Sequence, residues 1–180
     1  MKCPTKEECL KLLEEYKTPA HVRGHCMAVA ETAVTIGRAL KNKGYDLDLD
    51  LIEAAGLLHD IARTEEKHWE VGADMALSLG YREVSDIIRV HMTYEPFSHL
   101  ENISETDLVC LGDRLVMEDR YVGLDRRIDY VIAKAKRQGH PEAKPYILEK
   151  KEDAKRFIEE IEGALGRTID SLMEKESREI

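Results

Sequence analysis

The chain contains few residues of the kinds that mark secreted or membrane proteins. Its 180 residues include only 4 cysteines and 5 prolines, and aromatic residues make up 6%. Cys3, Cys9, Cys26 and Cys110 show no CxxC spacing, so we expect reduced thiols instead of a disulfide framework. No apolar run approaches membrane-spanning length, and no N-terminal stretch resembles a signal peptide. We therefore expect a cytoplasmic protein without a membrane partner.

Basic residues are also fewer than acidic ones. The chain has 27 Lys and Arg against 36 Asp and Glu, which gives a net charge of -9 at pH 7. Proteins that coat a nucleic-acid backbone need a basic face that displaces counterions from phosphate. The charge balance therefore argues against nucleic-acid coating. A small anionic substrate is still compatible with it, because a bound metal can invert the local field.

The chain does contain enough apolar residues for one core, in a pattern typical of helices. Hydrophobic residues make up 43% of the chain, and the length suits a single domain over residues 1–180. Thr5 and Glu8 have the spacing of a capping box and predict a first helix. Pro19 is expected to open a second helix, which Gly44 ends.

The segment 51–62 is almost wholly apolar and predicts a central, buried helix. Asp50 and Glu53 form a capping pair at its start. The remaining predicted elements are, in order, helices over 69–79 and 84–91 separated by Gly80, an irregular loop over 96–99, a helix from Ser104, a basic helix between Gly123 and Gly139, and a last long helix after Pro141 and Pro145. The fold class predicted is therefore all-α, a helical bundle with a long C-terminal helix.

The last helix is predicted as an extension over about 140–176. Its apolar residues keep three- and four-residue steps, at Ile158, Ile161, Leu165, Ile169 and Leu172. Such a stripe fits packing on the core and the seam of a homodimer equally well. We expect the charged residues after it to fray.

A histidine and an aspartate stand side by side in the most apolar part of the chain. His59 and Asp60 lie in the run Ala-Ala-Gly-Leu-Leu-His-Asp-Ile-Ala. Burying both groups costs several kcal/mol unless each finds a partner. Metal coordination would satisfy both, and so would a buried His–Asp hydrogen bond that only fixes core packing.

Further potential ligands lie at or near the other predicted helices. They are His25, His68, His91 and Asp113. Side chains from several helices can converge in the core of a bundle. Nitrogen and oxygen ligands in this mixture suit Mn, Fe, Co, Ni or Zn better than Mg or Ca. Two such ions bridged by one carboxylate, about 3.5–4 Å apart, would clamp phosphoryl oxygens and ionise a water.

The ordered set His25, His59-Asp60, His68, His91, Asp113 resembles the HD superfamily. That family is defined by a lone His, an adjacent His-Asp pair and a distal Asp. The flanking residues are similar too, in His-Cys-x-x-Val-Ala, Leu-Leu-His-Asp-Ile-Ala-Arg and Gly-Asp-Arg-Leu-Val. The two intermediate histidines resemble those of the subgroup that binds a second metal. The resemblance spans about Pro19 to Arg127.

The resemblance implies a metal-dependent phosphohydrolase that cleaves a phosphate ester or anhydride, often of a nucleotide, through a metal-activated water. His25, His59, Asp60 and Asp113 would form the core site, with Asp60 as bridging ligand, and His68 and His91 would complete a second site. Two divalent transition metals are implied. The basic residue after the pair is often Lys in the family and is Arg63 here, which still offers a bidentate cation for phosphate.

Several other residues are weaker candidates for the site. Arg114 and Arg120 are candidates for substrate binding beside Arg63, although exposed arginines more often face solvent or pair with acids. His21 lies one helical turn before His25 and is interpreted as an outer or surface residue. His99 and His140 are expected at the surface. Cys26, Cys110 and Trp69 are interpreted mainly as packing residues.

Two other functions use the same ligands. Some HD proteins are mixed-valent di-iron oxygenases, and a helical regulatory module could retain the metal for structure alone, with a closed coordination sphere. The Gly-Tyr-Pro extension of cyclic-dinucleotide phosphodiesterases is missing, because His91 is followed by Met92-Thr93-Tyr94. The chain is therefore not expected to hydrolyse cyclic-di-GMP.

Overall fold

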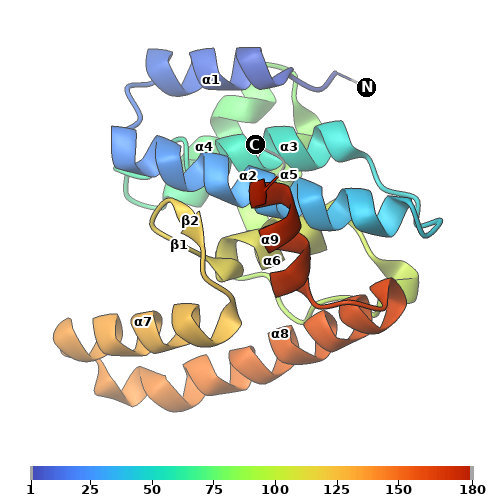
Figure 1. Cartoon of the computed structure of the whole chain (residues 1–180). Helices are drawn as coiled ribbons and strands as arrows, with labels where there is room; N and C mark the ends of the chain where they lie inside the picture. The colour runs from blue at the N-terminus through green and yellow to red at the C-terminus, as the bar shows by residue number, and fades with distance from the viewer. Residues whose placement is uncertain (1, 179–180) are drawn as a thin grey trace.

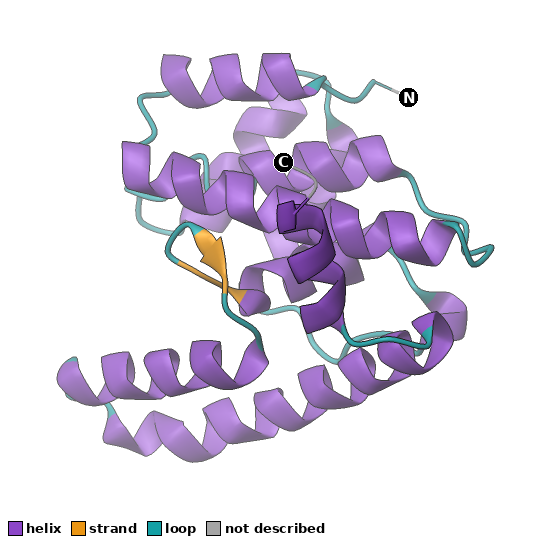
Figure 2. Cartoon of the chain, viewed as in Figure 1, coloured by secondary structure: helices purple, strands orange, loops and turns teal. Residues whose placement is uncertain are grey.

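The computed structural model describes residues 2–178 and confirms the predicted all-α class. Its elements run in the order α1 (Lys6–Glu15), α2 (Ala20–Lys41), α3 (Leu49–Leu58), α4 (His68–Ser78), α5 (Arg82–Val90), the 3₁₀ turn η1 (Leu100–Asn102), α6 (Glu105–Leu115), strands β1 (Val116–Met117) and β2 (Arg120–Tyr121), α7 (Leu124–Arg137), η2 (Pro141–Ala143), α8 (Lys144–Leu165) and α9 (Ile169–Arg178). Figure 2 shows a chain built almost wholly of helices. These helices share one main core. No helix in the described part of the chain is long and apolar enough to cross a membrane.

Helix α3 lies at the centre, as its apolar sequence predicts. Seven of its residues are buried, and α1, α2, α5 and α6 pack around it. The predicted boundaries were wrong at both ends. Asp48 caps the helix by accepting hydrogen bonds from the backbone of Asp50 and Leu51, so Asp50 is not the cap. The helix ends at Leu58, because residues 59–64 turn more tightly, beginning with the bond from Ile61 N to Leu58 O.

Two glycines let α2 approach its neighbours closely. A Cβ atom on Gly56 of α3 would lie 2.7 Å from Cα of Ala30, and one on Gly112 of α6 would lie 3.0 Å from the carbonyl oxygen of Val29. Any side chain at Gly56 would therefore overlap the backbone of α2. These contacts hold two helices against α2, which carries His25. Helix α3 directly precedes the His-Asp pair, and α6 carries Asp113.

The C-terminal helix was predicted as one long element and is two. Gly166 adopts a left-handed conformation with φ of +68° and ends α8, and α9 begins at Ile169. The backbone N–H of Ile169 donates to Glu162, which replaces a helical bond across the break. The apolar stripe still packs inward, since Ile161 and Leu165 of α8 and Ile169 of α9 are buried against the core.

Two features of the second half position the site. A small antiparallel hairpin, β1–β2, follows α6 and was not predicted, because strands of two residues leave no alternating pattern. Helix α7 then pairs with the first half of α8 to form a helical hairpin along one edge of the bundle (Figure 1). Helix α7 has one buried residue, Ile128, so most of its surface is free to face a cavity or solvent.

Candidate metal centre

Two of the candidate histidines are placed by the same local device at the ends of helices. His59 is the C-cap of α3, and its Nδ1 donates to the carbonyl of Gly56 at 2.7 Å. His91 is the C-cap of α5, and its Nδ1 donates to the carbonyl of Ile88 at 2.6 Å. The carbonyl groups at a helix end lack helical partners, so a ring nitrogen can take one. In both residues Nε2 then points away from the helix and is left available as a ligand.

His25 is oriented by the unpredicted hairpin. Its Nδ1 donates to the carbonyl of Glu118, in the β1–β2 turn, at 2.9 Å. Glu118 has φ of +56°, a left-handed conformation that reverses the chain at this point. Nε2 of His25 lies 2.9 Å from Oδ1 of Asp113, which the last turn of α6 carries. The hairpin therefore positions the first histidine of the set toward the distal aspartate.

Asp60 lies between two groups of histidines. Its Oδ2 lies 3.6 Å from Nε2 of His59 and 3.9 Å from Nε2 of His25. Its Oδ1 lies 3.1 Å from Nε2 of His68 and 3.4 Å from Nε2 of His91. Two potential metal clusters result, and Asp60 is common to both. Asp113 joins the first cluster, because its Oδ1 is also 3.6 Å from Nε2 of His59.

The histidines and aspartates of the cluster shift one another's pKa values. Burial alone would raise the pKa of Asp60, but His59, His68 and His91 outweigh burial and hold it far below its ordinary value. Burial would likewise raise the pKa of Asp113, which His25 and His59 hold well below normal. Burial alone would lower the pKa of His59, yet Asp60 raises it. The histidines and the carboxylates therefore favour one another's charged forms across the cluster.

The buried nitrogen atoms fit a metal better than they fit a purely structural cluster. Nε2 of His59 and Nε2 of His91 are buried without a hydrogen-bond partner in the described structure. An unpaired buried polar atom costs roughly 1–3 kcal/mol. Two such atoms, each within 4 Å of the Asp60 carboxylate, are placed as metal ligands would be. Four imidazoles and two carboxylates are a ligand set for divalent transition metals.

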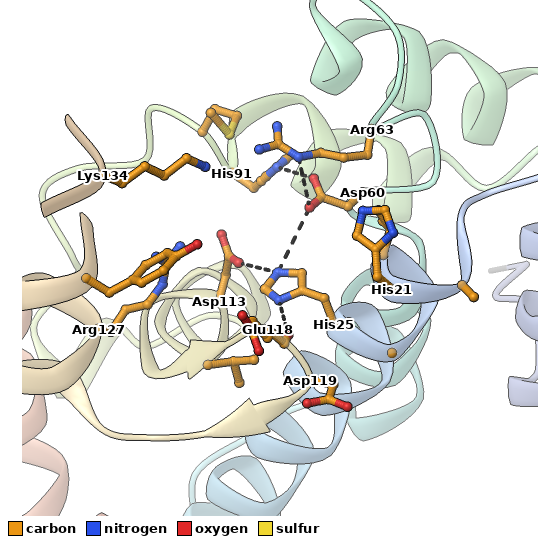
Figure 3. Close-up of a pocket in the computed structure, with 16 residues that line it drawn as sticks. His21, His25, Asp60, Arg63, His91, Asp113, Glu118, Asp119, Arg127 and Lys134 are labelled. Carbon is orange, nitrogen blue, oxygen red and sulfur yellow. Dashed lines mark hydrogen bonds and ion pairs between the residues drawn. The ribbon is translucent and has the colours of Figure 1, made fainter. Parts of the chain in front are cut away.

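A cavity of about 610 Å³ opens onto this cluster (Figure 3). The candidate ligands that line it are His25, Asp60, His91 and Asp113. Arg63 also lines it, and its Nε lies 3.8 Å from Oδ2 of Asp60 while its Nη1 lies 3.3 Å from the ring of His68. The side chain of Arg63 is 42% exposed. It can therefore turn toward a ligand in the cavity.

The structure places the other two candidate arginines outside this cavity. The guanidinium group of Arg114 lies over the ring of Phe97, 4.6 Å from its centre, and donates to the carbonyl of Tyr94. Arg120 is in β2 and faces a separate groove beside α2 and α9. Neither side chain is brought to the cluster, and Arg114 instead holds the loop that follows α5.

The remaining candidates lie close to their expected positions. His21 is exposed at the rim of the cavity, one turn before His25. His99 and His140 are exposed and pair with Glu160 and Glu142. The ring of Trp69 packs edge-on against that of His68, with ring centres 5.3 Å apart. Cys26 and Cys110 are buried, and burial raises the pKa of Cys110 to about 12.

Sequence reasoning missed the wall of the cavity that α7 provides. Arg127, Tyr130 and Lys134 all line the cavity opposite α2. They are spaced at i, i+3 and i+7, so they share one face of the helix. That polar stripe was visible in the sequence, but nothing in the sequence indicated that α7 would turn it toward the histidines.

Three comparisons bear on what the cluster is. A profile described as the HD domain matches residues 22–118. An uncharacterized protein of Methanocaldococcus jannaschii is 31% identical, over 79% of this chain and 92% of its own length. A tRNA (cytidine(56)-2'-O)-methyltransferase of Thermoplasma volcanium is 28% identical over 70% of this chain, which spans 40% of the methyltransferase. No solved structure gives a significant match.

Proposed function

The chain belongs to the HD domain family, and from this premise we propose that it is a metal-dependent phosphohydrolase. Its substrate would be a phosphate ester or anhydride of a nucleotide or of another small phosphorylated metabolite. The cofactor would be two divalent transition metals, Mn, Fe, Co, Ni or Zn. Arg63, beside Asp60 at the cavity, would bind the phosphoryl group.

One observation carries the proposal: the two oxygens of Asp60 face two different groups of histidines. Oδ2 faces His25 and His59, and Oδ1 faces His68 and His91. Asp60 would therefore help to hold one ion with His25 and His59 and another with His68 and His91. A bound pair of ions supplies Lewis acidity at the phosphoryl oxygens and lowers the pKa of a water.

The rest of the machinery belongs to the chain. Backbone carbonyls hold the rings of His25, His59 and His91, so that their Nε2 atoms face the cluster without reorganisation. In the reaction, the oxygen of one water forms a bond to phosphorus and the bond from phosphorus to the leaving oxygen breaks. The proton that the water loses ends on the leaving group or in solvent. Arg63 would offset negative charge on the phosphoryl oxygens.

The tRNA activity in the second relative's name is not assigned to this chain, because the chain spans only 40% of that protein. The name of the Methanocaldococcus jannaschii relative, which matches over 92% of its own length, gives no activity.

Asp60→Asn tests the proposal, because it keeps the shape of the side chain but leaves one oxygen for two clusters. His140→Ala is the control, since His140 is exposed and pairs only with Glu142 within the described structure. Metal content and phosphate release from nucleotides and simple phosphate esters would be measured for both variants and the wild type. We expect Asp60→Asn to lose metal and at least about 100-fold in activity, and His140→Ala to keep both.

Wild-type protein that binds two ions per chain but releases no phosphate from any member of the panel would contradict the hydrolase. Iron-dependent oxygen uptake in the same preparation would favour the oxygenase instead. A tightly held ion without turnover of either kind would favour a structural metal.

A further inference from the structure

Helix α7 presents two cations to the cavity from the side opposite Arg63. Arg127 and Lys134 both line the cavity, with Tyr130 between them on the same face of the helix. Figure 3 shows their side chains extending from α7 toward the region of Asp113 and His91, while Arg63 approaches Asp60 from the other direction. The cluster of ligands therefore lies between two separate sources of positive charge.

The Nε–H group of Arg127 has no acceptor among the described residues. Its nitrogen atom is buried. The guanidinium carbon of Arg127 lies over the ring of Tyr130, 5.6 Å from its centre. A buried guanidinium N–H without an acceptor is costly, and an anionic ligand would supply the acceptor.

Lys134 is exposed and makes no ion pair among the described residues, so its charge is available to a ligand in the cavity. By contrast, Lys151 of α8 pairs with Asp125 of α7 at 2.9 Å. Asp60 and Asp113, which share the cavity with Lys134, would be neutralised by the metals. The other carboxylates of the cavity, Glu118 and Asp119, lie in the β1–β2 turn and not on α7. The two cations of α7 then face a cavity with room for a ligand well beyond a single phosphoryl group.

We propose that Arg127 and Lys134 bind a second anionic group of the substrate, beyond the phosphoryl group at the metal centre. The substrate class is then a compound with at least two phosphates, such as a nucleoside diphosphate or triphosphate. This inference rests on the proposed function for the position of the first phosphoryl group. It assigns α7 the selection of polyphosphates over monophosphates.

Binding of two non-hydrolysed probes tests this assignment without relying on turnover. The probes are analogues of adenosine monophosphate and adenosine diphosphate in which methylene replaces the 5′ ester oxygen and, in the diphosphate, the bridging oxygen as well. They are titrated by calorimetry into manganese-loaded protein with free manganese held constant. Arg127→Gln and Lys134→Gln are compared with Arg126→Gln and Lys136→Gln. Arg126 and Lys136 lie on the same helix and do not line the cavity. Each control variant loses the same charge as its counterpart in the cavity, Arg126 for Arg127 and Lys136 for Lys134.

We expect wild-type protein to bind the diphosphate analogue more tightly than the monophosphate analogue. Each cavity variant should lose about ten-fold in affinity for the diphosphate analogue and less than about two-fold for the monophosphate analogue. Arg127→Lys should recover part of the loss. Equal losses in cavity and control variants, or equal losses for the two probes, would overturn the assignment. Because no probe is hydrolysed, a failure of the hydrolase proposal would show in phosphate release and not in these ratios.

Discussion

At the scale of single residues, the hydroxyl of Thr18 holds the turn that carries the His-Asp pair. Thr18 lies just before α2 and is 5% exposed, and its Oγ1 donates to the carbonyl of Ile61 at 2.8 Å. That carbonyl belongs to the tight turn after α3, one residue beyond Asp60. The hydrogen bond therefore ties the turn that carries Asp60 to the segment that leads into the helix of His25.

Thr18→Val should destabilise the protein by about 1–3 kcal/mol, because it leaves the Ile61 carbonyl without its partner at nearly constant volume. It should also weaken metal binding, since the turn can then shift. Urea denaturation and metal titration would measure both effects. Thr35→Val is the control, because Thr35 is also buried but makes no side-chain hydrogen bond within the described residues. Equal effects from the two substitutions would contradict the role of Thr18.

The residues that form the cluster were accessible from the sequence, whereas the groups that hold them in place were not. A histidine and an aspartate in an apolar run required partners, and the ordered resemblance supplied the other four residues that the structure brings together. The carbonyl of Glu118, which orients His25, belongs to a hairpin too short to leave a pattern. Arg127 and Lys134 were missed because their helix is placed by packing, not by local sequence.

At the scale of elements, α2 and α3 approach each other closely at Gly56. Gly56→Ala should cost about 1–3 kcal/mol, because the new methyl group would meet backbone and no side-chain rotation can relieve the overlap. It should also separate His59 from His25 and weaken the first metal cluster. Gly163→Ala in α8, where nothing lies within 4 Å, should instead stabilise by about 0.5–1 kcal/mol. Thermal unfolding and metal titration of both variants would check the contrast.

Two helix starts could be predicted from their capping residues. The capping box of Thr5 and Glu8 is present as predicted, and Ser104 begins α6 with a box completed by Asp107. The end of α3 was misplaced because the ring of His59 and the hydroxyl of Thr18 bind carbonyls there, and only the folded chain brings Thr18 close. The apolar stripe of the last helix continues across Gly166, so periodicity alone could not reveal the break.

At the scale of the whole molecule, the C-terminal helices are fastened to the loop that follows α5. Glu160 of α8 accepts hydrogen bonds from the backbone of Leu100 at 2.9 Å and from Arg156 at 2.8 Å, and His99 lies 2.9 Å away. Burial alone would raise the pKa of Glu160, but these three partners outweigh it and lower the pKa to about 2. The apolar stripe of α8 and α9, which fitted either the core or a dimer seam, packs against the core of the same chain.

The depressed pKa predicts a pH-dependent contribution to stability. Glu160 contributes fully above its ordinary pKa of 4.5, and the contribution is lost as the pH falls from 4.5 toward 2. Glu160→Gln should therefore cost about 1–2 kcal/mol at pH 7 and much less near pH 2.5. Denaturant unfolding at the two pH values would measure the difference. Glu159→Gln, at an exposed neighbour, should show no such pH dependence; a cost for Glu160→Gln that is the same at both values would contradict the prediction.

The α7 helix carries five Lys and Arg against two Asp, on a chain whose net charge is -9. An anion diffusing toward this protein is thus repelled by most of the surface and attracted along one edge, which is also one wall of the cavity. Such a charge asymmetry raises the rate of encounter as well as the affinity, and dissolved salt weakens it. The same helix would then act before binding, as a guide that brings anions to the mouth of the cavity.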